Sequence, residues 1–138
     1  MDKFKIYIDG SYNEEKNLGG YGLLILNNKD EVIHTEFKTL TEGTEIRNVY
    51  GEIVSACRAV EIAILNNHKE VDIYFDYAGI EKWATGEWKR KNEYTKKYGE
   101  YMNNAQKHIK INFNKVKGHS GDKFNDMADK LAKQGAGF

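Results

Sequence analysis

Residues Lys3–Asp9 read KFKIYID, an alternation of polar and apolar side chains that ends on an acid. Alternation at every second residue is typical of a β-strand with one buried face. A second stretch, Val71–Asp76 (VDIYFD), is more continuously apolar, as central strands are, and also ends on an acid. Functional sites gather at the carboxyl ends of strands in open α/β sheets. If these two strands are neighbours, Asp9 and Asp76 form a paired site.

Together with the rest of the sequence, these two strands predict the element order βββαβαβα. Tyr21–Leu26 and Val32–Leu40 are strand-like and flank a turn at Asn27–Asp30. From Val49 to about residue 67, apolar residues recur at three- and four-residue spacing, which predicts a helix. Further along the chain we expect a short helix over Gly79–Ala84, a basic loop, a helix over about Thr95–Gln106, a strand over Ile109–Val116, a turn at Gly118–Gly121 and a helix over Asn125–Lys133. A hairpin run followed by βα units implies an α/β fold with a mixed sheet of about five strands flanked by helices.

The composition is that of an ordinary globular protein. The 138 residues, 40% of them hydrophobic and 30% charged, suit a single domain over residues 1–138 with a real core. No apolar run approaches the roughly 20 residues of a membrane span, and no secretory segment precedes the first strand, so we expect no membrane partner. One cysteine cannot form an internal disulfide, which favours a reducing, cytoplasmic compartment. We expect a monomer.

The net charge of zero hides an uneven distribution. Residues 1–53 carry 6 basic and 10 acidic side chains, whereas residues 54–138 carry 15 and 11. The stretch Trp88–Lys97 (WKRKNEYTKK) alone holds five basic residues against one glutamate. Phosphate binding needs a local basic footprint rather than a basic total, although a solvated helix face explains such a run equally well.

Two more acids join Asp9 and Asp76 as candidates, and each of the four has an ordinary interpretation by itself. Asp9 suits a turn, Asp76 a helix cap, and Glu52 the positive end of a helix dipole. Asp129 borders the apolar stripe of the last expected helix. An acid at such a border needs a compensating base or metal ion.

Taken together, four carboxylates without a soft ligand set suit Mg²⁺ or Mn²⁺ rather than zinc. Two such ions about 3.5–4 Å apart activate a water and stabilise the leaving oxygen at a phosphodiester. His119, in a glycine-bounded turn, is by itself most simply a surface residue, but beside a phosphoryl-transfer site it can move a proton. No zinc-ligand spacing relates the remaining soft ligands, Cys57, His34, His68 and His108.

Several short motifs follow one another in a fixed order over nearly the whole chain. They are Ile8-Asp9-Gly10-Ser11, an apparent glycine turn at Gly19-Gly20-Tyr21-Gly22, Glu52, Tyr74-Phe75-Asp76, Gly79-Ile80, Trp83, Trp88, Gly118–Gly121 and Asn125–Leu131. No single motif is specific, but the ordered combination resembles type 1 ribonuclease H. The resemblance implies a ribonuclease H-like fold and metal-dependent endonucleolytic cleavage of the RNA strand of RNA–DNA hybrids, leaving 5′-phosphate and 3′-hydroxyl ends.

The same resemblance implies a role for each acid. Asp9 would bridge two Mg²⁺ ions, Glu52 and Asp76 would complete one of them, and Asp129 the other. His119 would assist product release.

The resemblance further implies a surface that grips the hybrid. Its expected members are Gly10, Ser11, Asn13, Asn48, Trp83, Lys89, Arg90 and Lys91. Asn48, and with it Asn13, is expected at the minor groove and DNA backbone, and the basic residues at DNA phosphates. Trp83 is expected either to pack against a sugar or to fill the core. Contacts to 2′-hydroxyls on one strand are how such a site distinguishes RNA from DNA.

Three residues depart from the family pattern. Tyr77 follows the third acid, where Ser or Thr is common, and Val49 stands where a polar amide is typical. Arg47 replaces a frequent phosphate-binding Thr, and the basic loop is short. We therefore expect weaker or more salt-sensitive hybrid binding. Two other functions stay open: a non-catalytic nucleic-acid-binding module of the same fold, and a related DNA-directed nuclease or integrase.

Overall fold

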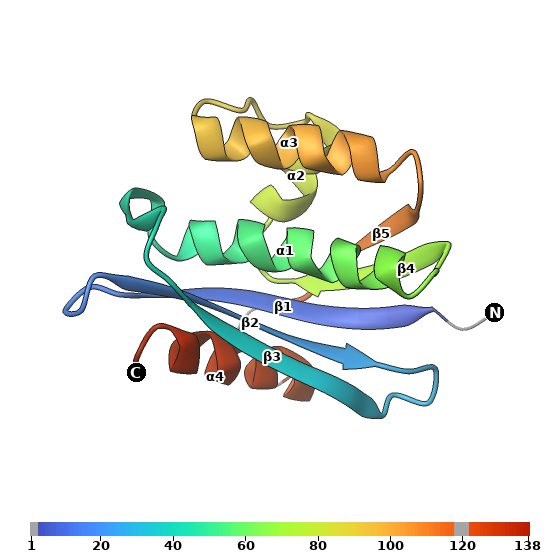
Figure 1. The fold of residues 1–138 in the computed structure, drawn as a ribbon, viewed down its shortest axis with the longest axis horizontal. Coiled ribbons are helices and arrows are strands. Elements are labelled where there is room, and N and C mark those ends of the chain that lie inside the picture. Colours follow the sequence, from blue (N-terminus) through green and yellow to red (C-terminus); the bar gives the residue numbers. More distant parts are fainter. Residues whose placement is uncertain (1–2, 118–121) are drawn as a thin grey trace.

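A computed structural model describes residues 3–117 and 122–138, and its centre is a five-stranded mixed sheet in the order β3-β2-β1-β4-β5 (Figure 1). Neighbours β1, β2 and β3 are antiparallel, while β1, β4 and β5 are parallel. The strands are β1 (Phe4–Asn13), β2 (Leu18–Leu26), β3 (Val32–Leu40), β4 (Glu70–Phe75) and β5 (Lys110–Lys115). The predicted mixed sheet, with the two acid-bearing strands as neighbours, is confirmed.

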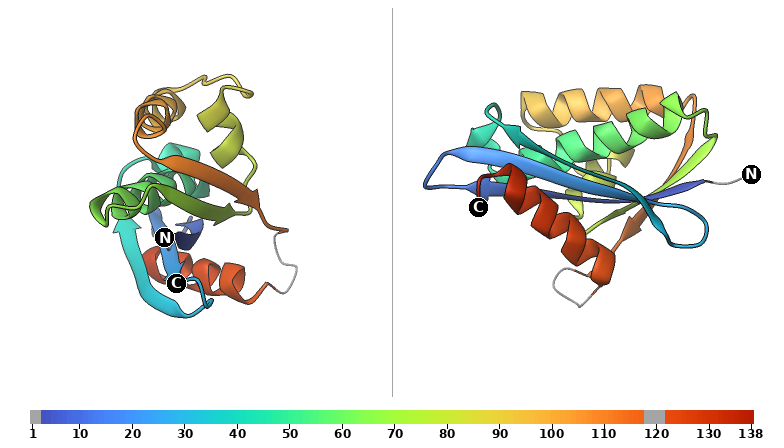
Figure 2. Two further views of the ribbon diagram at one scale, coloured as in Figure 1. Left: turned by 90° about the vertical axis from the view of Figure 1, so that its right-hand side faces the viewer. Right: turned by 60° about the horizontal axis from the view of Figure 1, so that its bottom comes forward.

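Helices cover both faces of this sheet (Figure 2). On one face lies α1 (Asn48–Leu65), preceded by a 3₁₀ turn at Thr44–Ile46, with α2 (Gly79–Thr85) and α3 (Glu93–Ala105) packed beyond it. On the other face α4 (Lys123–Gly135) crosses β1, β2 and β3. The short helix and the longer helix expected on either side of the basic loop are both present, so two helices separate β4 from β5. None of the helices in the described residues has the length and apolar character needed to cross a bilayer.

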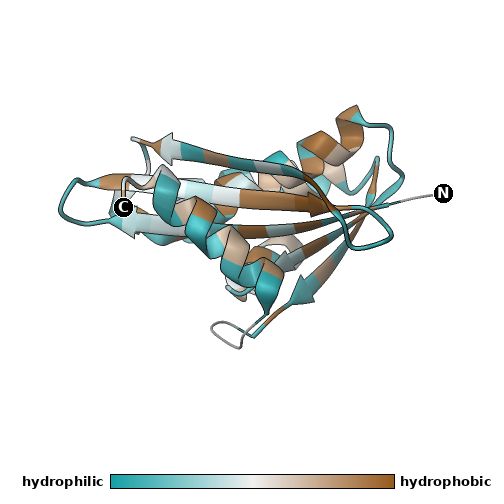
Figure 3. Ribbon diagram, turned by 90° about the horizontal axis from the view of Figure 1, so that it is seen from below, coloured by the Kyte–Doolittle hydropathy of each residue, from teal (hydrophilic) through white to brown (hydrophobic). Residues whose placement is uncertain are grey.

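The alternating side chains of Lys3–Asp9 pack into two cores, one on each face of β1. Ile6 and Ile8 belong to the larger core beneath α1, whereas Tyr7 packs with Leu24 and Ala128 in a smaller core beneath α4. Figure 3 shows α4 lying across the sheet from that second side. Burial of apolar area on both sides of one strand fixes its register, because a slip of one residue would exchange the two faces.

Two sequence predictions about the first strands are wrong. β1 does not end at Asp9 but continues to Asn13, because these residues stay paired with β2. The glycine-rich stretch Gly19–Gly22 is not a turn, since it lies within β2 and pairs with both β1 and β3. The error has one cause: hydrogen bonding to a neighbouring strand extends β structure through residues with low intrinsic strand preference.

Candidate active site

Asp9 and Asp76 are brought level by the parallel pairing of β1 with β4. The last paired residues are Tyr7 and Tyr74, so a step of two residues along each strand leads to Asp9 and to Asp76. Asp76, predicted as the last residue of its strand, lies directly after the end of β4 at Phe75. Although β1 runs on beyond Asp9, its partner on this side has ended, so the two acids occupy an open edge. Such edges at the carboxyl ends of parallel strands are where α/β proteins place their sites.

Glu52 reaches the same edge because α1 lies unusually close to β1. A Cβ atom at Gly10 would sit 2.4 Å from both the Asn48 carbonyl oxygen and the Glu52 amide nitrogen. Only glycine fits at this contact, which anchors the first turns of the helix against the strand. One carboxylate oxygen from each of Asp9, Glu52 and Asp76 consequently lies within 4.8 Å of the others. We call these three residues the carboxylate triad.

A second close contact brings Asp129 towards the triad from the opposite face. Gly22 pairs with Asp9 in the sheet, and a Cβ atom there would sit 2.5 Å from the Ala132 amide nitrogen of α4. The negative charge of Asp129 is felt at Asp9, where it contributes to a raised pKa. Asp129 nevertheless differs from the triad, because it is 31% exposed and its carboxylate is 3.1 Å from the Lys133 ammonium. The compensating partner expected for this acid is therefore present as a base.

The electrostatics of the triad are those of carboxylates held together against repulsion. Burial raises the pKa of Asp9 to about 7, and the charges of Asp76 and Asp129 add to the rise, against hydrogen bonds with Glu52 and the Gly10 amide. The Gly10 N–H donates to Asp9 Oδ1 at 2.9 Å. Burial also raises the pKa of Glu52 well above its usual range, with the Asp9 charge next in importance. Without a cation, the pair therefore keeps its protons to a higher pH than most carboxylates do.

This donor set fits hard divalent cations. Glu52 Oε2 is buried and has no hydrogen-bond partner among the described residues. Neither Asp9 nor Glu52 has a Lys or Arg partner within that part of the chain. A buried carboxylate oxygen without a donor is costly, and a cation bound from solution removes that cost. Oxygen ligands alone suit Mg²⁺ or Mn²⁺.

Several expected hybrid contacts lie where substrate can reach them. Asn48 is the exposed first residue of α1, and Ser11 is half-buried in β1 beyond Asp9. Lys89 and Lys91 are exposed in the loop between α2 and α3. His119 lies outside the described residues.

Two other expected contacts have structural partners instead. Asn13 is buried, and its side-chain oxygen accepts from the Lys16 amide to close the β1–β2 turn. The Arg90 guanidinium donates to the Trp83 carbonyl oxygen at 2.8 Å and to that of Ala84 at 3.5 Å, which binds it to the end of α2. We therefore leave Asn13 and Arg90 out of the hybrid contacts proposed below.

The sequence reasoning missed two features beside the triad. The Lys133 partner of Asp129 is one helical turn away, and its i,i+4 spacing is a signal that points to such a pair. The second is an aromatic cluster, formed by Tyr77, Trp83 and Trp88, whose ring centroids lie 5.6–6.2 Å apart. Trp83 thus both packs in a cluster and stays half-buried, between the two roles expected for it. No residue spacing in the sequence predicts this cluster, because its members come from a helix and from the loops on either side of it.

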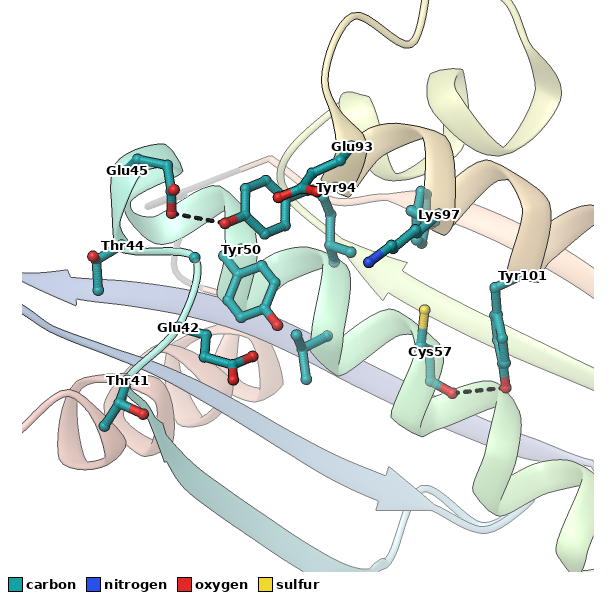
Figure 4. A pocket seen from close by; sticks show the side chains of 14 residues that line it. Thr41, Glu42, Thr44, Glu45, Tyr50, Cys57, Glu93, Tyr94, Lys97 and Tyr101 are labelled. Atoms are coloured by element: carbon teal, nitrogen blue, oxygen red, sulfur yellow. Dashed lines mark hydrogen bonds between the residues drawn. The ribbon is translucent and has the colours of Figure 1, made fainter.

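A groove of about 780 Å³ lies elsewhere, between the loop before α1, α1 itself and α3 (Figure 4). Tyrosine rings form much of its wall, and Tyr94 donates to Glu45 at 2.9 Å. Three glutamates and one lysine supply its charged groups: Glu42, Glu45, Glu93 and Lys97. A net negative lining repels a polyanion, so this groove is not a nucleic-acid site.

Comparison with known proteins agrees with this geometry. The RNase H family model matches residues 1–137. The chain is 31% identical to the ribonuclease H of Acetivibrio thermocellus, with 96% of this chain and 93% of that protein covered. Among solved structures, the N-terminal RNase H domain of Rv2228c from Mycobacterium tuberculosis superposes with a TM-score of 0.82 at 19% identity, covering 99% of this chain and 95% of that one. LC11-RNase H1 in complex with an RNA/DNA hybrid superposes with a TM-score of 0.75 at 18% identity, covering 96% and 98%.

Proposed function

The chain belongs to the RNase H family, as a type 1 ribonuclease H, and from this premise we propose that its carboxylate triad cleaves the RNA strand of RNA–DNA hybrids. The observation that carries the proposal is the meeting of Asp9, Glu52 and Asp76 within 4.8 Å at the open end of two parallel strands. A similarly folded protein, LC11-RNase H1, is known in complex with an RNA/DNA hybrid, which supports the substrate. The cleaved ends would be a 5′-phosphate and a 3′-hydroxyl.

The residues divide the work of holding two divalent ions. Asp9 would contact both, with Glu52 and Asp76 completing one and Asp129 the other. The chemistry that Mg²⁺ or Mn²⁺ supplies when bound is activation of a water and stabilisation of the leaving oxygen. The Gly10 amide donates to Asp9 Oδ1 and so restrains the orientation of this carboxylate. Asp129 forms an ion pair with Lys133. This pair would have to open, wholly or in part, for Asp129 to bind a cation.

Hybrid binding would be shared between the ends of several elements. Asn48 at the exposed start of α1 and Ser11 in β1 flank the triad and are placed for the minor groove. Lys89 and Lys91 are proposed to hold DNA phosphates, and His119 to assist product release. The protein is proposed to act as a monomer, within one catalytic domain. Because the lysines are few, hybrid affinity should be weak, and it should fall with salt in proportion to the number of phosphates that they contact.

The test compares three substrates of matched sequence in Mg²⁺: RNA–DNA hybrid, duplex DNA and single-stranded RNA. The wild type should cut the RNA of the hybrid and neither of the others. Asp76→Asn should reduce cleavage by about a thousandfold, because a neutral amide neither balances nor holds a divalent cation. Asp126→Asn is the matched control, since this exposed acid on α4 should be dispensable.

Each alternative function has its own outcome in this comparison. Hybrid binding without cleavage would support a non-catalytic module, and cleavage of duplex DNA would support a DNA-directed nuclease. Wild-type rates in Asp76→Asn would remove the triad from the mechanism. Circular dichroism and thermal melting of each variant confirm that the fold is intact.

A further inference from the structure

Tyr77 is the residue beside the triad for which the proposed chemistry has no use. It directly follows Asp76, at a position where the family commonly has Ser or Thr. The position is therefore level with the open edge at which the three carboxylates meet. The nearby charge of Glu52 is felt at the Tyr77 side chain.

The Tyr77 ring is held in a defined place by the aromatic cluster. Its centroid lies 5.7 Å from that of Trp83 and 6.2 Å from that of Trp88, and the two tryptophans contact each other edge to face at 5.6 Å. Gly79 makes room for the ring, because a Cβ atom there would sit 2.4 Å from Tyr77 Cε2. A ring fixed on several sides holds its hydroxyl with little loss of freedom on binding.

That hydroxyl is not used inside the protein. Five other tyrosines of the described chain donate to protein acceptors: Tyr12, Tyr21, Tyr94, Tyr98 and Tyr101. Tyr77 has no hydrogen bond among the described residues, and its oxygen is not among the buried atoms that lack a partner, so it reaches the surface. A tyrosine whose ring is packed and whose hydroxyl is free at the rim of a site is suited to contact a ligand.

A second position near a triad member carries an apolar side chain in place of a polar one. Val49 stands where an amide is typical, and it lies one helical turn before Glu52 on α1. Val49 and Tyr77 both pack against the core beneath α1, and each lies within three residues of a triad member along the chain. A site that must distinguish RNA from DNA needs a hydrogen-bonding group at this rim.

We propose that Tyr77 is a substrate-specificity residue whose hydroxyl binds a 2′-hydroxyl of the RNA strand next to the cleaved phosphate. A phenol both donates and accepts one hydrogen bond, as a 2′-hydroxyl does. A phosphate oxygen is the poorer match, because it only accepts and so uses one of the two hydrogen-bonding roles of the phenol. The inference rests on the proposed function, since it assigns a contact to the substrate of that same site.

The test is a cycle that removes one hydroxyl from each partner. Wild type and Tyr77→Phe are assayed on an RNA–DNA hybrid with one cleavage site, and on hybrids in which single ribonucleotides around that site are replaced by 2′-deoxynucleotides. Tyr77→Phe should raise KM for the all-RNA strand about fivefold, with kcat little changed, as expected for one neutral hydrogen bond. At one position, deoxy substitution should cost the wild type a similar factor and cost Tyr77→Phe nothing.

Tyr101→Phe is the matched control, because it also loses one phenol hydroxyl but does so at the Cys57 carbonyl in the distant groove. Its deoxy penalties should equal those of the wild type at every position. If Tyr77→Phe keeps every penalty of the wild type, or lowers kcat without changing KM, the proposed contact is wrong while hybrid cleavage stands. If the wild type does not cut the hybrid at all, the proposed function fails and the contact fails with it.

Discussion

Two carboxylate groups beside the same sheet, one around Glu36 and one around Asp9, have pKa values shifted in opposite directions. Glu36 of β3 accepts from the Arg58 guanidinium at 2.9 and 3.1 Å and from the Tyr21 hydroxyl at 2.5 Å. Although burial opposes the change, these donors and His34 lower the pKa of Glu36 to about 2. Asp9 has carboxylates for neighbours instead of a guanidinium, and burial raises its pKa to about 7.

The difference lies in where the neutralising charge comes from. Around Glu36 the protein supplies its own cation, so the group is complete and adds to stability. Asp9 and Glu52 have no Lys or Arg partner in the described residues, so their burial is costly until a cation arrives from solution. Acids near one another are therefore not informative by themselves. Whether the fold gives them a base separates a structural group from a candidate metal site.

The largest expected effect comes from removing one charge from each group. Asp9→Asn should lower hybrid cleavage by about a thousandfold, yet raise the free energy of unfolding of the metal-free protein by about 1 kcal/mol, because repulsion is relieved. Glu36→Gln should leave cleavage intact and lower the free energy of unfolding by about 1–2 kcal/mol, through loss of charged hydrogen bonds. Urea unfolding in a chelator and single-turnover cleavage in Mg²⁺ measure the two quantities. If Asp9→Asn and Glu36→Gln both lowered the free energy of unfolding, the proposed difference between the two groups would be wrong.

A smaller effect should appear as opposite pH dependences. The folded pKa of Asp9 is raised from 3.8 to about 7, so its contribution to stability is present below pH 3.8 and lost as pH rises towards 7. The folded pKa of Glu36 is lowered from 4.5 to about 2, so its contribution is present above pH 4.5 and lost as pH falls towards 2. Metal-free protein should therefore melt at lower temperature at pH 7 than at pH 5.

Millimolar Mg²⁺ sharpens that pH measurement, because it competes with the protons of the triad. It should raise the melting temperature at pH 7 more than at pH 5, by ligand linkage. Asp9→Asn should lose most of the Mg²⁺ response, while Glu36→Gln should keep it. An equal Mg²⁺ shift in both variants would show that the ion stabilises the protein at another place.

The smallest effect tests Asp129, which stands between the two groups because it has both a nearby acid and a base. Lys133→Gln should change the free energy of unfolding by no more than about 0.5 kcal/mol, as expected for an exposed i,i+4 pair. It should also lower the Mg²⁺ concentration needed for half-maximal cleavage, since the cation no longer competes with an ammonium. A higher Mg²⁺ requirement would indicate that Asp129 acts with Lys133 in stabilising the fold and not in binding Mg²⁺. Lys130→Gln, an exposed lysine on the same helix, is the control.

Much of this fold was predictable because local patterns agreed with one another. The period of two in Lys3–Asp9 and the helical period after Val49 were confirmed as β1 and α1, and the strand predicted over Val71–Asp76 was confirmed as β4, which ends one residue earlier. The extension of β1 to Asn13 and the placing of Gly19–Gly22 inside β2 were not predictable, because pairing between strands determined both. The functional roles of the four acids and the hybrid contacts stay predictions.

The sequence by itself determined the elements of the fold and the acids that leave them, because periodicity and residue chemistry are local properties. Only the tertiary structure decided which acids have a base. Glu36 and Arg58 are 22 residues apart, and the strands that lead to Asp9 and Asp76 are separated along the chain by β2, β3 and α1. The close backbone contacts at Gly10 and Gly22 likewise exist only in three dimensions. They set how closely α1 and α4 approach the sheet. Electrostatic energy depends on distance and burial, and neither can be read along a chain.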